Sequence, residues 1–404
     1  MRHSTLQALS SWHLPGLITG PQIRDQTLSI RAETSFSLKD DLFNEHSVAR
    51  LADGLAAAGK GFQRKRFERA VLAAFPELEL KARIDHMVSV LGDHLPAEVP
   101  KALDILERAL PPPLDPTLRD DDFGSFIWVV PGEYAARHGC SSRHLKRSLN
   151  FLRESTKRFS AESAIRPFLR DFPDATLKFA HDCAEDENYH VRRLASEGTR
   201  PLLPWATRVK LPADSIVALL ERLHADSTRY VTRSVANNMN DLSKQDPALV
   251  IRTLKQWQKA QRQQPAELDW MVRHSLRTLT KQDHIPALSL LGYPARPNVR
   301  IGNLKIPRCI QAGDTLNCEF DLEAKTAQKL LVTLRVFFLK ANGKQAPKVF
   351  TVAKADFQRG QLSTLSKKLS FRPMTTRVMY PGAHRIEVVV NGQTQIGQDF
   401  QLVA

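Results

Sequence analysis

The chain has 404 residues, of which 42% are hydrophobic and 25% are charged, and its formal net charge is +15. This length exceeds one compact core, so we expect two domains, and the composition excludes a fibrous or wholly disordered protein. A surplus of positive charge favours a polyanionic partner, although it can also serve solubility alone. Since the sequence has no run of about 18 apolar residues, nucleic acid is a better candidate than a membrane.

The first 35 residues are polar and irregular, and Ser10, Ser11, His13 and Pro15 interrupt their only apolar stretch. We predict a flexible N-terminal extension rather than a signal peptide. The four cysteines are scattered, and the closest two, Cys309 and Cys318, are nine positions apart, which matches no common zinc spacing. The sequence therefore predicts free thiols of a cytoplasmic protein and no metal site.

Apolar residues recur at helical spacing in the chain before residue 295, for example at Ile84, Met87, Val88 and Leu91. We predict a helical domain over residues 36–295. Three similar segments within it begin at Tyr189, Tyr230 and Trp270.

The three segments place Arg193, Arg233 and Arg273 at intervals of 40 residues. This interval is typical of stacked helix pairs of the HEAT and armadillo type. The spacing predicts a row of arginines on the second helix of each pair, able to contact phosphates at regular steps. The alternative is three independently solvated arginines.

Strand patterns dominate after residue 300. The segment 331–338 is rich in β-branched and aromatic residues, and the segment 386–390 is followed by Asn391-Gly392, which favours a tight hairpin turn. Residues 341–344 repeat the turn pattern, and residues 294–297 form a short Pro-containing linker. We predict a small β-sandwich over residues 300–404. Residues 301–404 hold 15 Lys and Arg but 7 Asp and Glu, which favours a second DNA-contacting module.

Three polar clusters carry candidate chemistry, and the densest spans residues 188–205. Glu197 lies near the end of a predicted helix, where the helix dipole disfavours a carboxylate, and Gly198 and Pro201 are expected to stop that helix. The alternative is a surface glutamate paired with Arg193 or Arg200.

The second cluster spans residues 156–167, where Ser160 or Ser163 is expected to cap a helix with Glu162 near its start. Glu162 is then either a functional carboxylate or a capping one. The third cluster, residues 234–241, places three asparagines and Asp241 on an otherwise apolar helix. These poor helix formers would suit the polar lining of a groove, although Asp241 alone could simply end the helix.

Segments 158–167, 190–205, 234–241 and 270–279 together resemble the AlkC-type alkylbase DNA glycosylases, relatives of the AlkD-type enzymes. The resemblance covers residues 36–295, and the C-terminal region resembles the immunoglobulin-like domain of one AlkC branch. It implies an all-α HEAT-like repeat solenoid followed by a small all-β immunoglobulin-like sandwich.

The resemblance further implies a bacterial repair enzyme, which we expect in the cytoplasm and nucleoid. Nothing in the sequence demands more than a monomer, and the reaction requires no cofactor. The enzyme's partner would be double-stranded DNA, from which it excises cationic bases such as 3-methyladenine and 3-methylcytosine without full base flipping. The implied catalytic residues are Glu162, Glu197, Asp241 and Trp205. The implied DNA-binding residues are Arg158, Arg166, Arg192, Arg193, Arg200, Arg233, Asn237, Asn240, Arg273 and Arg277.

These residue types suit the reaction, because an alkylated cationic base leaves without a general acid while positive charge develops on the sugar. Carboxylates can stabilise that charge and position water, and an indole can stack on the nucleotide. A non-catalytic helical scaffold would explain the repeat and the charge but not the three polar clusters. A base-flipping enzyme would need an enclosed pocket, which an open solenoid does not readily supply.

Overall fold

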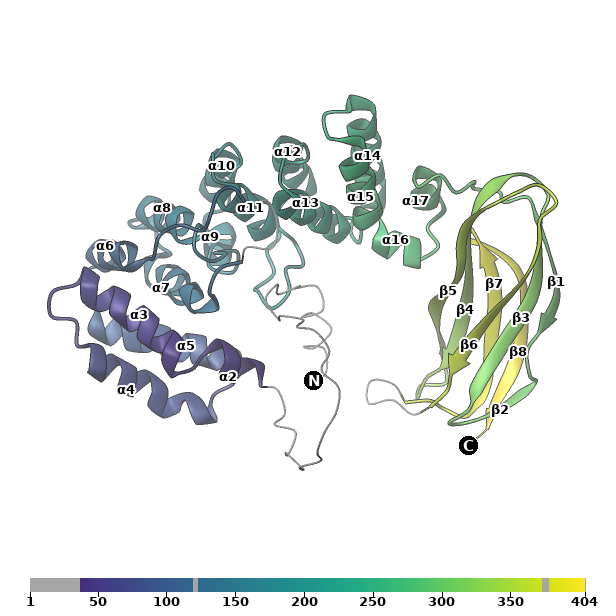
Figure 1. The fold of residues 1–404 in the computed structure, drawn as a ribbon, viewed down its shortest axis with the longest axis horizontal. Coiled ribbons are helices and arrows are strands. Elements are labelled where there is room, and N and C mark those ends of the chain that lie inside the picture. Colours follow the sequence, from purple (N-terminus) through teal and green to yellow (C-terminus); the bar gives the residue numbers. More distant parts are fainter. Residues whose placement is uncertain (1–36, 119–122, 373–377, 404) are drawn as a thin grey trace, which may run out of the picture. The chain divides into compact units, whose positions relative to one another are not determined.

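The computed structural model describes residues 37–118, 123–372 and 378–403, with helices first and strands after them (Figure 1). The predicted extension at residues 1–35 lies outside these residues. The chain divides into two compact units, the first ending at Asp241 and also taking in residues 262–264, and the second beginning at Leu242. Across the described ranges, no helix is long and apolar enough to cross a membrane.

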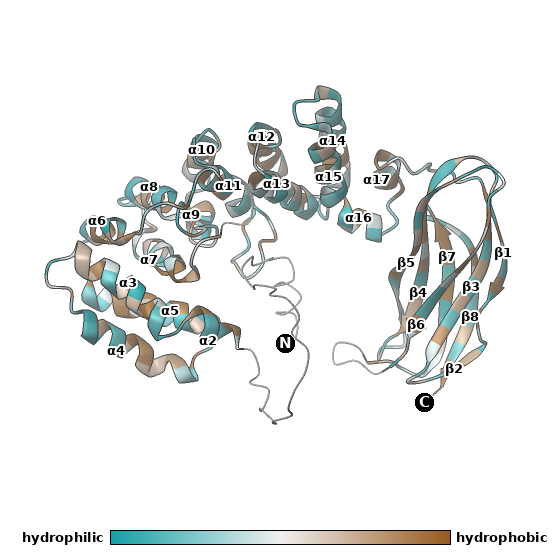
Figure 2. Ribbon diagram, viewed as in Figure 1, coloured by the Kyte–Doolittle hydropathy of each residue, from teal (hydrophilic) through white to brown (hydrophobic). Residues whose placement is uncertain are grey.

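The first unit is helical. Its helices are α2 (Leu38–Leu42), α3 (Glu45–Ala58), α4 (Arg64–Ala74), α5 (Leu80–His94), α6 (Val99–Ala109), α7 (Val129–Gly139), α8 (Leu145–Ser155), α9 (Arg166–Asp171), α10 (Pro173–Cys183), α11 (Tyr189–Gly198), α12 (Ala213–Leu223) and α13 (Arg229–Leu242). Each longer helix carries both apolar and polar residues (Figure 2). Leu51 of α3, Phe67 of α4 and Phe151 of α8 are fully buried in one core, so burial of one face stabilises these helices.

The 40-residue spacing correctly predicts three successive helix pairs. They are α10 with α11, α12 with α13, and α14 (Pro247–Ala260) with α15 (Pro265–Ser275). Arg193, Arg233 and Arg273 each lie on the second helix of a pair, as expected. Their surroundings differ, because Arg193 is buried, Arg233 is half-buried and Arg273 is exposed.

The second unit adds α16 (Arg277–Lys281), α17 (Ile285–Leu290) and an immunoglobulin-like sandwich. Its strands are β1 (Val299–Lys305), β2 (Cys309–Gln311), β3 (Thr315–Ala324), β4 (Gln328–Leu339), β5 (Gln345–Phe357), β6 (Leu362–Ser370), β7 (Gly382–Val390) and β8 (Gln393–Val403). One sheet has the order β1-β3-β6 and the other β2-β8-β7-β4-β5. Phe320, Phe371 and Phe400 are buried in the core of the sandwich.

Both hairpin turns predicted from the sequence are present. Asn391 and Gly392 have φ values of 47° and 81° between β7 and β8, and Gly343 has φ 72° between β4 and β5. Asparagine and glycine tolerate this left-handed region better than other residues.

The sandwich is fixed to the last helices by polar contacts. Arg335 Nη2 of β4 lies 2.7 Å from Asp283 Oδ2, in the turn before α17. Lys329 Nζ donates to Leu291 O at 2.9 Å, and Asn391 Nδ2 donates to Pro294 O at 3.1 Å. The predicted linker at residues 294–297 is therefore held against the sandwich.

Candidate active site

The three predicted carboxylates of the first unit meet in one chain of buried ion pairs. Its members, called the carboxylate network below, are Glu162, Arg193, Glu197, Arg200 and Asp241. They come from the segment before α9, from α11 and the residues after it, and from the end of α13. The packing of successive helix pairs thus joins residues that lie 31 and 41 positions apart in the sequence.

Glu162 forms one end of the network. Its Oε2 accepts hydrogen bonds from Arg193 Nη1 and Ser160 Oγ, both at 2.8 Å. Both bonds end on the same oxygen, so Oε1 remains an acceptor for a bound group. The Glu162 side chain is 10% exposed, against 5% for Glu197 and 3% for Asp241, and it is therefore the carboxylate most accessible from outside.

Glu197 lies between the two guanidinium groups. Its Oε1 accepts from Arg200 Nη1 at 2.5 Å, and its Oε2 is 3.7 Å from Arg193 Nη2. Burial raises the pKa of Glu197, but the charges of Arg200 and Arg193 together lower it by more than burial raises it. The pKa therefore lies well below its ordinary value. The Ser234 hydroxyl also adjoins this carboxylate, although its proton goes to Ser196 Oγ at 2.9 Å. Glu197 is therefore ionised at neutral pH.

Asp241 forms the other end of the network, where its Oδ2 accepts from Arg200 Nε at 2.9 Å. The neighbouring Asn238 fixes α13 against the end of α11, because its Nδ2 donates to Ser196 O at 2.9 Å and Thr199 Oγ1 at 3.2 Å. One of the three asparagines thus has a structural purpose that the sequence did not indicate.

The predicted serine cap before Glu162 is wrong. Helix α9 begins at Arg166, with Ile165 at the N-cap and no side-chain cap. Ser160 instead bonds the Glu162 carboxylate and the Arg193 guanidinium, each at 2.8 Å. Glu162 accordingly does not cap a helix, because an arginine from another helix engages its carboxylate.

The predicted end of the helix at Gly198 is confirmed, since Gly198 is the last residue of α11, but Gly198 has no left-handed φ and Thr199 follows it as the C-cap with φ −88°. A β-carbon at position 198 would lie 2.6 Å from Ile165 Cγ2. Glycine is required here by the close approach of α11 to the segment before α9, which brings Glu162 to Arg193.

Trp205 lies in the loop between α11 and α12, residues 199–212, and is half-buried. Its φ of 64° is in the left-handed region, which bulky residues seldom adopt. Lys81 Nζ of α5 donates a hydrogen bond to Trp205 O.

Five predicted DNA-binding arginines of the first unit are engaged with other groups of the protein. Arg193 and Arg200 hold the carboxylates, and Arg166 donates to carbonyl oxygens of residues 198 and 200 at 2.8 and 2.9 Å. Arg158 Nε donates to Pro111 O at 2.7 Å, and Arg192 Nε lies 2.5 Å from Asp226 Oδ2. Their contact with phosphate stays a prediction, and the structure gives each a role within the protein.

The remaining predicted DNA-binding residues differ in exposure. Arg273 of α15 is exposed, and Arg277 of α16 is half-buried and donates to His274 O at 2.6 Å. Arg233 and Asn237 of α13 are half-buried, whereas Asn240 is buried. Exposure alone thus leaves Arg273 the most accessible of the predicted phosphate contacts.

Tyr230 belongs to the site but was predicted only as a repeated aromatic residue. The Arg193 guanidinium carbon lies 4.5 Å from the centre of its ring, which is the geometry of a cation–π contact. The repeat places Tyr230 in the first turn of α13, as it places Tyr189 in the first turn of α11, but it did not indicate the contact with Arg193.

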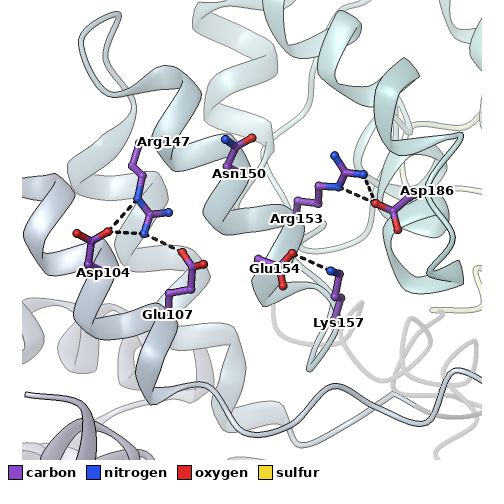
Figure 3. A pocket seen from close by; sticks show the side chains of 8 residues that line it. All are labelled: Asp104, Glu107, Arg147, Asn150, Arg153, Glu154, Lys157 and Asp186. Carbon is purple, nitrogen blue, oxygen red and sulfur yellow. Dashed lines mark hydrogen bonds and ion pairs between the residues drawn. The ribbon is translucent and has the colours of Figure 1, made fainter.

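A separate hollow of about 600 Å³ lies on α6 and α8 (Figure 3). Its charged residues pair with one another, as Arg147 does with Asp104 and Glu107 at 2.8 and 2.7 Å. None of the network residues lines it. Among the residues that the structure describes, no group of three or more His, Cys, Asp or Glu is placed to hold a metal ion.

The fold and the site together define a helical-repeat protein with a buried carboxylate network and an immunoglobulin-like C-terminal domain. The family model of the YhaZ C-terminal Ig-like domain matches residues 300–404. The chain is 30% identical over 367 residues to YhaZ of Bacillus subtilis (strain 168), an uncharacterised protein, covering 90% of this chain and 98% of that one.

A solved structure also matches over most of the chain. It is the Pseudomonas fluorescens alkylpurine DNA glycosylase AlkC, bound to DNA that contains an abasic site analog. The match has a TM-score of 0.77 and 33% identity and covers 91% of this chain and all of AlkC. The chain belongs to the AlkC family.

Proposed function

We propose that the protein is a DNA glycosylase that hydrolyses the N-glycosidic bond of cationic alkylated bases in double-stranded DNA. The observation that carries this proposal is the meeting of Glu162, Glu197 and Asp241 through two arginines in one buried network. The full-length likeness to an alkylpurine DNA glycosylase supports it. Candidate substrates are 3-methyladenine and 3-methylcytosine.

The chemistry suits carboxylates that stay ionised. When the glycosidic bond of an alkylated base breaks, its electron pair neutralises the cationic base, so no general acid is needed. The sugar becomes an oxocarbenium-like cation, which a nearby carboxylate stabilises. Glu197, whose pKa is lowered by Arg200 and Arg193 despite its burial, cannot donate a proton at neutral pH, and such a reaction does not require one.

The three carboxylates then have different roles. Glu162 is the most exposed of the three and keeps Oε1 as an acceptor, so we assign it to the sugar cation and the attacking water. Water adds to C1′ and gives its proton to that carboxylate or to solvent. Glu197 and Asp241 act through Arg193 and Arg200, which hold the network in one geometry.

This assignment revises the role of two arginines. Arg193 and Arg200 were expected to bind phosphate, and we now propose that they orient carboxylates. Preoriented charges need no reorganisation as the transition state forms, which is the main advantage of an enzyme site over water. Trp205 is assigned to stacking on the nucleotide, a contact of about 1–2 kcal/mol when desolvated.

The test is release of free methylated base from methylated duplex DNA, measured by mass spectrometry under single-turnover conditions. We expect Glu162→Gln to lower the rate by about 10²-fold or more, because a buried charge beside a developing cation contributes several kcal/mol. The matched control is Glu185→Gln, an exposed glutamate paired with Arg222 at 2.8 Å, which should keep the wild-type rate. DNA binding by wild type without any release would favour a non-catalytic scaffold.

The sandwich is proposed as a second DNA-contacting module. Lys344, Lys354 and Lys368 are exposed on it. Each phosphate contact contributes about one to the slope, called the salt slope below, of the logarithm of the DNA-binding constant against the logarithm of the salt concentration. Replacing all three by glutamine should reduce that slope, and an unchanged slope would remove these lysines from the interface. We further propose that the protein works as a monomer in the bacterial cytoplasm on nucleoid DNA, without full base flipping.

A further inference from the structure

The loop between α11 and α12, residues 199–212, carries two residues of the proposed site. Arg200 reaches Glu197 Oε1 at 2.5 Å and Asp241 Oδ2 at 2.9 Å, and Trp205 is the proposed stacking residue. Trp205 has φ 64°, and a bulky residue keeps a left-handed conformation only where its surroundings hold the backbone.

Besides Lys81, which donates to Trp205 O, Arg166 contacts the main chain of this loop; it is the first residue of α9 and is 1% exposed. Its Nη1 donates to Gly198 O at 2.8 Å and to Arg200 O at 2.9 Å, and its Nε donates to Thr207 O. One planar guanidinium therefore binds the main chain where the loop begins, at residues 198 and 200, and again after Trp205, at Thr207. We propose that Arg166 is a positioning residue that fixes this loop and thereby places Arg200 and Trp205.

A buried arginine at position 166 stabilises the folded protein less than an apolar side chain of similar size would. Burial lowers its pKa to about 10, and the charge of Arg200 adds to that effect. Its Nη2 is buried and donates no hydrogen bond to any described residue. A buried charge with an unused donor is less favourable than a well-packed apolar side chain, which points to a role in orienting the loop.

The contact continues from Arg166 to the carboxylates. Arg166 holds the main-chain oxygen of Arg200, and the side chain of Arg200 holds Glu197 and Asp241. A displacement of about 1 Å of positioned groups can lower a rate by about 10²-fold. The catalytic part of this inference rests on the proposed glycosylase function, whereas the fixing of the loop does not.

The test compares Arg166→Met with a matched arginine. Arg83 is 2% exposed and also donates to main-chain oxygens, those of Phe43 and Phe75 at 2.9 Å each, but in the N-terminal helices. Trypsin cleavage at the exposed Arg208 and Lys210 reports on the loop. Single-turnover excision at saturating protein and the salt dependence of binding to DNA with an abasic analog report on the site.

We expect Arg166→Met to be cut in the loop about fivefold faster or more, because freeing the loop raises its open population. The excision rate at saturation should fall about 10- to 100-fold with an unchanged salt slope. Arg166→Lys keeps the charge without the fork, should be intermediate, and serves if the methionine variant does not fold. Arg83→Met should lower the melting temperature but keep loop cleavage and the rate within about twofold of wild type.

Two results would overturn the inference. One is a folded Arg166 variant with wild-type loop cleavage. The other is a smaller salt slope with an unchanged rate at saturation, because that pattern belongs to a phosphate contact. If wild type releases no base, the proposed function fails, and loop cleavage still decides whether Arg166 fixes the loop.

Discussion

Replacing Glu197 by glutamine removes the central charge of the carboxylate network and nearly preserves its shape. At an effective dielectric constant of about 20, charges at 2.5 and 3.7 Å attract with about 7 and about 4 kcal/mol. Desolvation of the buried groups offsets much of this attraction. Removing one partner of a buried ion pair costs about 3–5 kcal/mol, and we expect about 3 kcal/mol here because glutamine keeps an acceptor oxygen.

This loss should depend on pH. The folded pKa of Glu197 lies below its ordinary value of 4.5, so the ionised carboxylate stabilises the folded unit fully above pH 4.5. The stabilisation is lost as the pH falls from 4.5 through the folded pKa. The difference in unfolding free energy between wild type and Glu197→Gln should therefore be complete at pH 7 and smaller at pH 3.5.

Scanning calorimetry at both pH values measures the effect. For a unit of this size, about 3 kcal/mol corresponds to a fall of about 6–12 °C in melting temperature. The control Glu185→Gln breaks an exposed ion pair whose side chains are 64% and 50% exposed and should cost less than about 1 kcal/mol. A loss at pH 7 no larger than that of the control, or one undiminished at pH 3.5, would refute the electrostatic reasoning.

Three further outcomes are expected. Gly198→Ala puts a β-carbon 2.6 Å from Ile165 Cγ2 and should destabilise the first unit by about 1–3 kcal/mol in thermal unfolding; a melting temperature equal to wild type would contradict this close approach. Asp283→Asn keeps a residue that tolerates φ 55° but removes one of the two carboxylate partners of Arg335, leaving Glu387. Hydrogen exchange should therefore rise in residues 285–297 while the sandwich core stays protected, and unchanged exchange would mean that the Asp283–Arg335 pair does not hold the sandwich. A maleimide should label Cys309 quickly, because Cys309 is exposed. The other three thiols should react slowly, because burial raises the pKa of Cys140, Cys183 and Cys318 to about 11, 12 and 11. Several fast-reacting thiols in the folded protein would be inconsistent with these raised pKa values.

Much of the fold could be predicted from local patterns. The β-branched and aromatic residues of β4, the Asn391-Gly392 turn and the second helices of the repeat lie where the sequence placed them. These features depend on neighbours within one helix or hairpin. The parallel pairing of β2 with β8 and the contact of Arg335 with Asp283 are long-range, and no local pattern indicates them.

The same distinction between local patterns and long-range contacts applies to the candidate site. The residue types and the resemblance selected Glu162, Glu197 and Asp241, and packing brings them together. Pairing of Glu197 with Arg193 or Arg200 was the alternative expected from the sequence, because each arginine lies within four positions of Glu197, and the structure has both pairs, although buried. The sequence did not reveal that Arg193 also holds Glu162 and that Arg200 also holds Asp241, because these partners lie 31 and 41 positions away. Ser160 was misread for the same reason: its neighbours in sequence suggested a cap, whereas its bonding partner Arg193 lies 33 positions away.

The burial of the network bears on why it exists. Apolar residues of similar volume often match or exceed the stability of a buried ion pair, so stability alone does not explain five charged side chains in one place. Each guanidinium is shared between carboxylates, Arg193 between Glu162 and Glu197 and Arg200 between Glu197 and Asp241. A carboxylate held in this way has little freedom to turn, and its charge is already in place before a cation forms. This arrangement lowers the stability of the folded protein, and it becomes favourable only when a positive charge develops nearby and is stabilised by it. Loss of an alkylated base creates such a charge on the sugar.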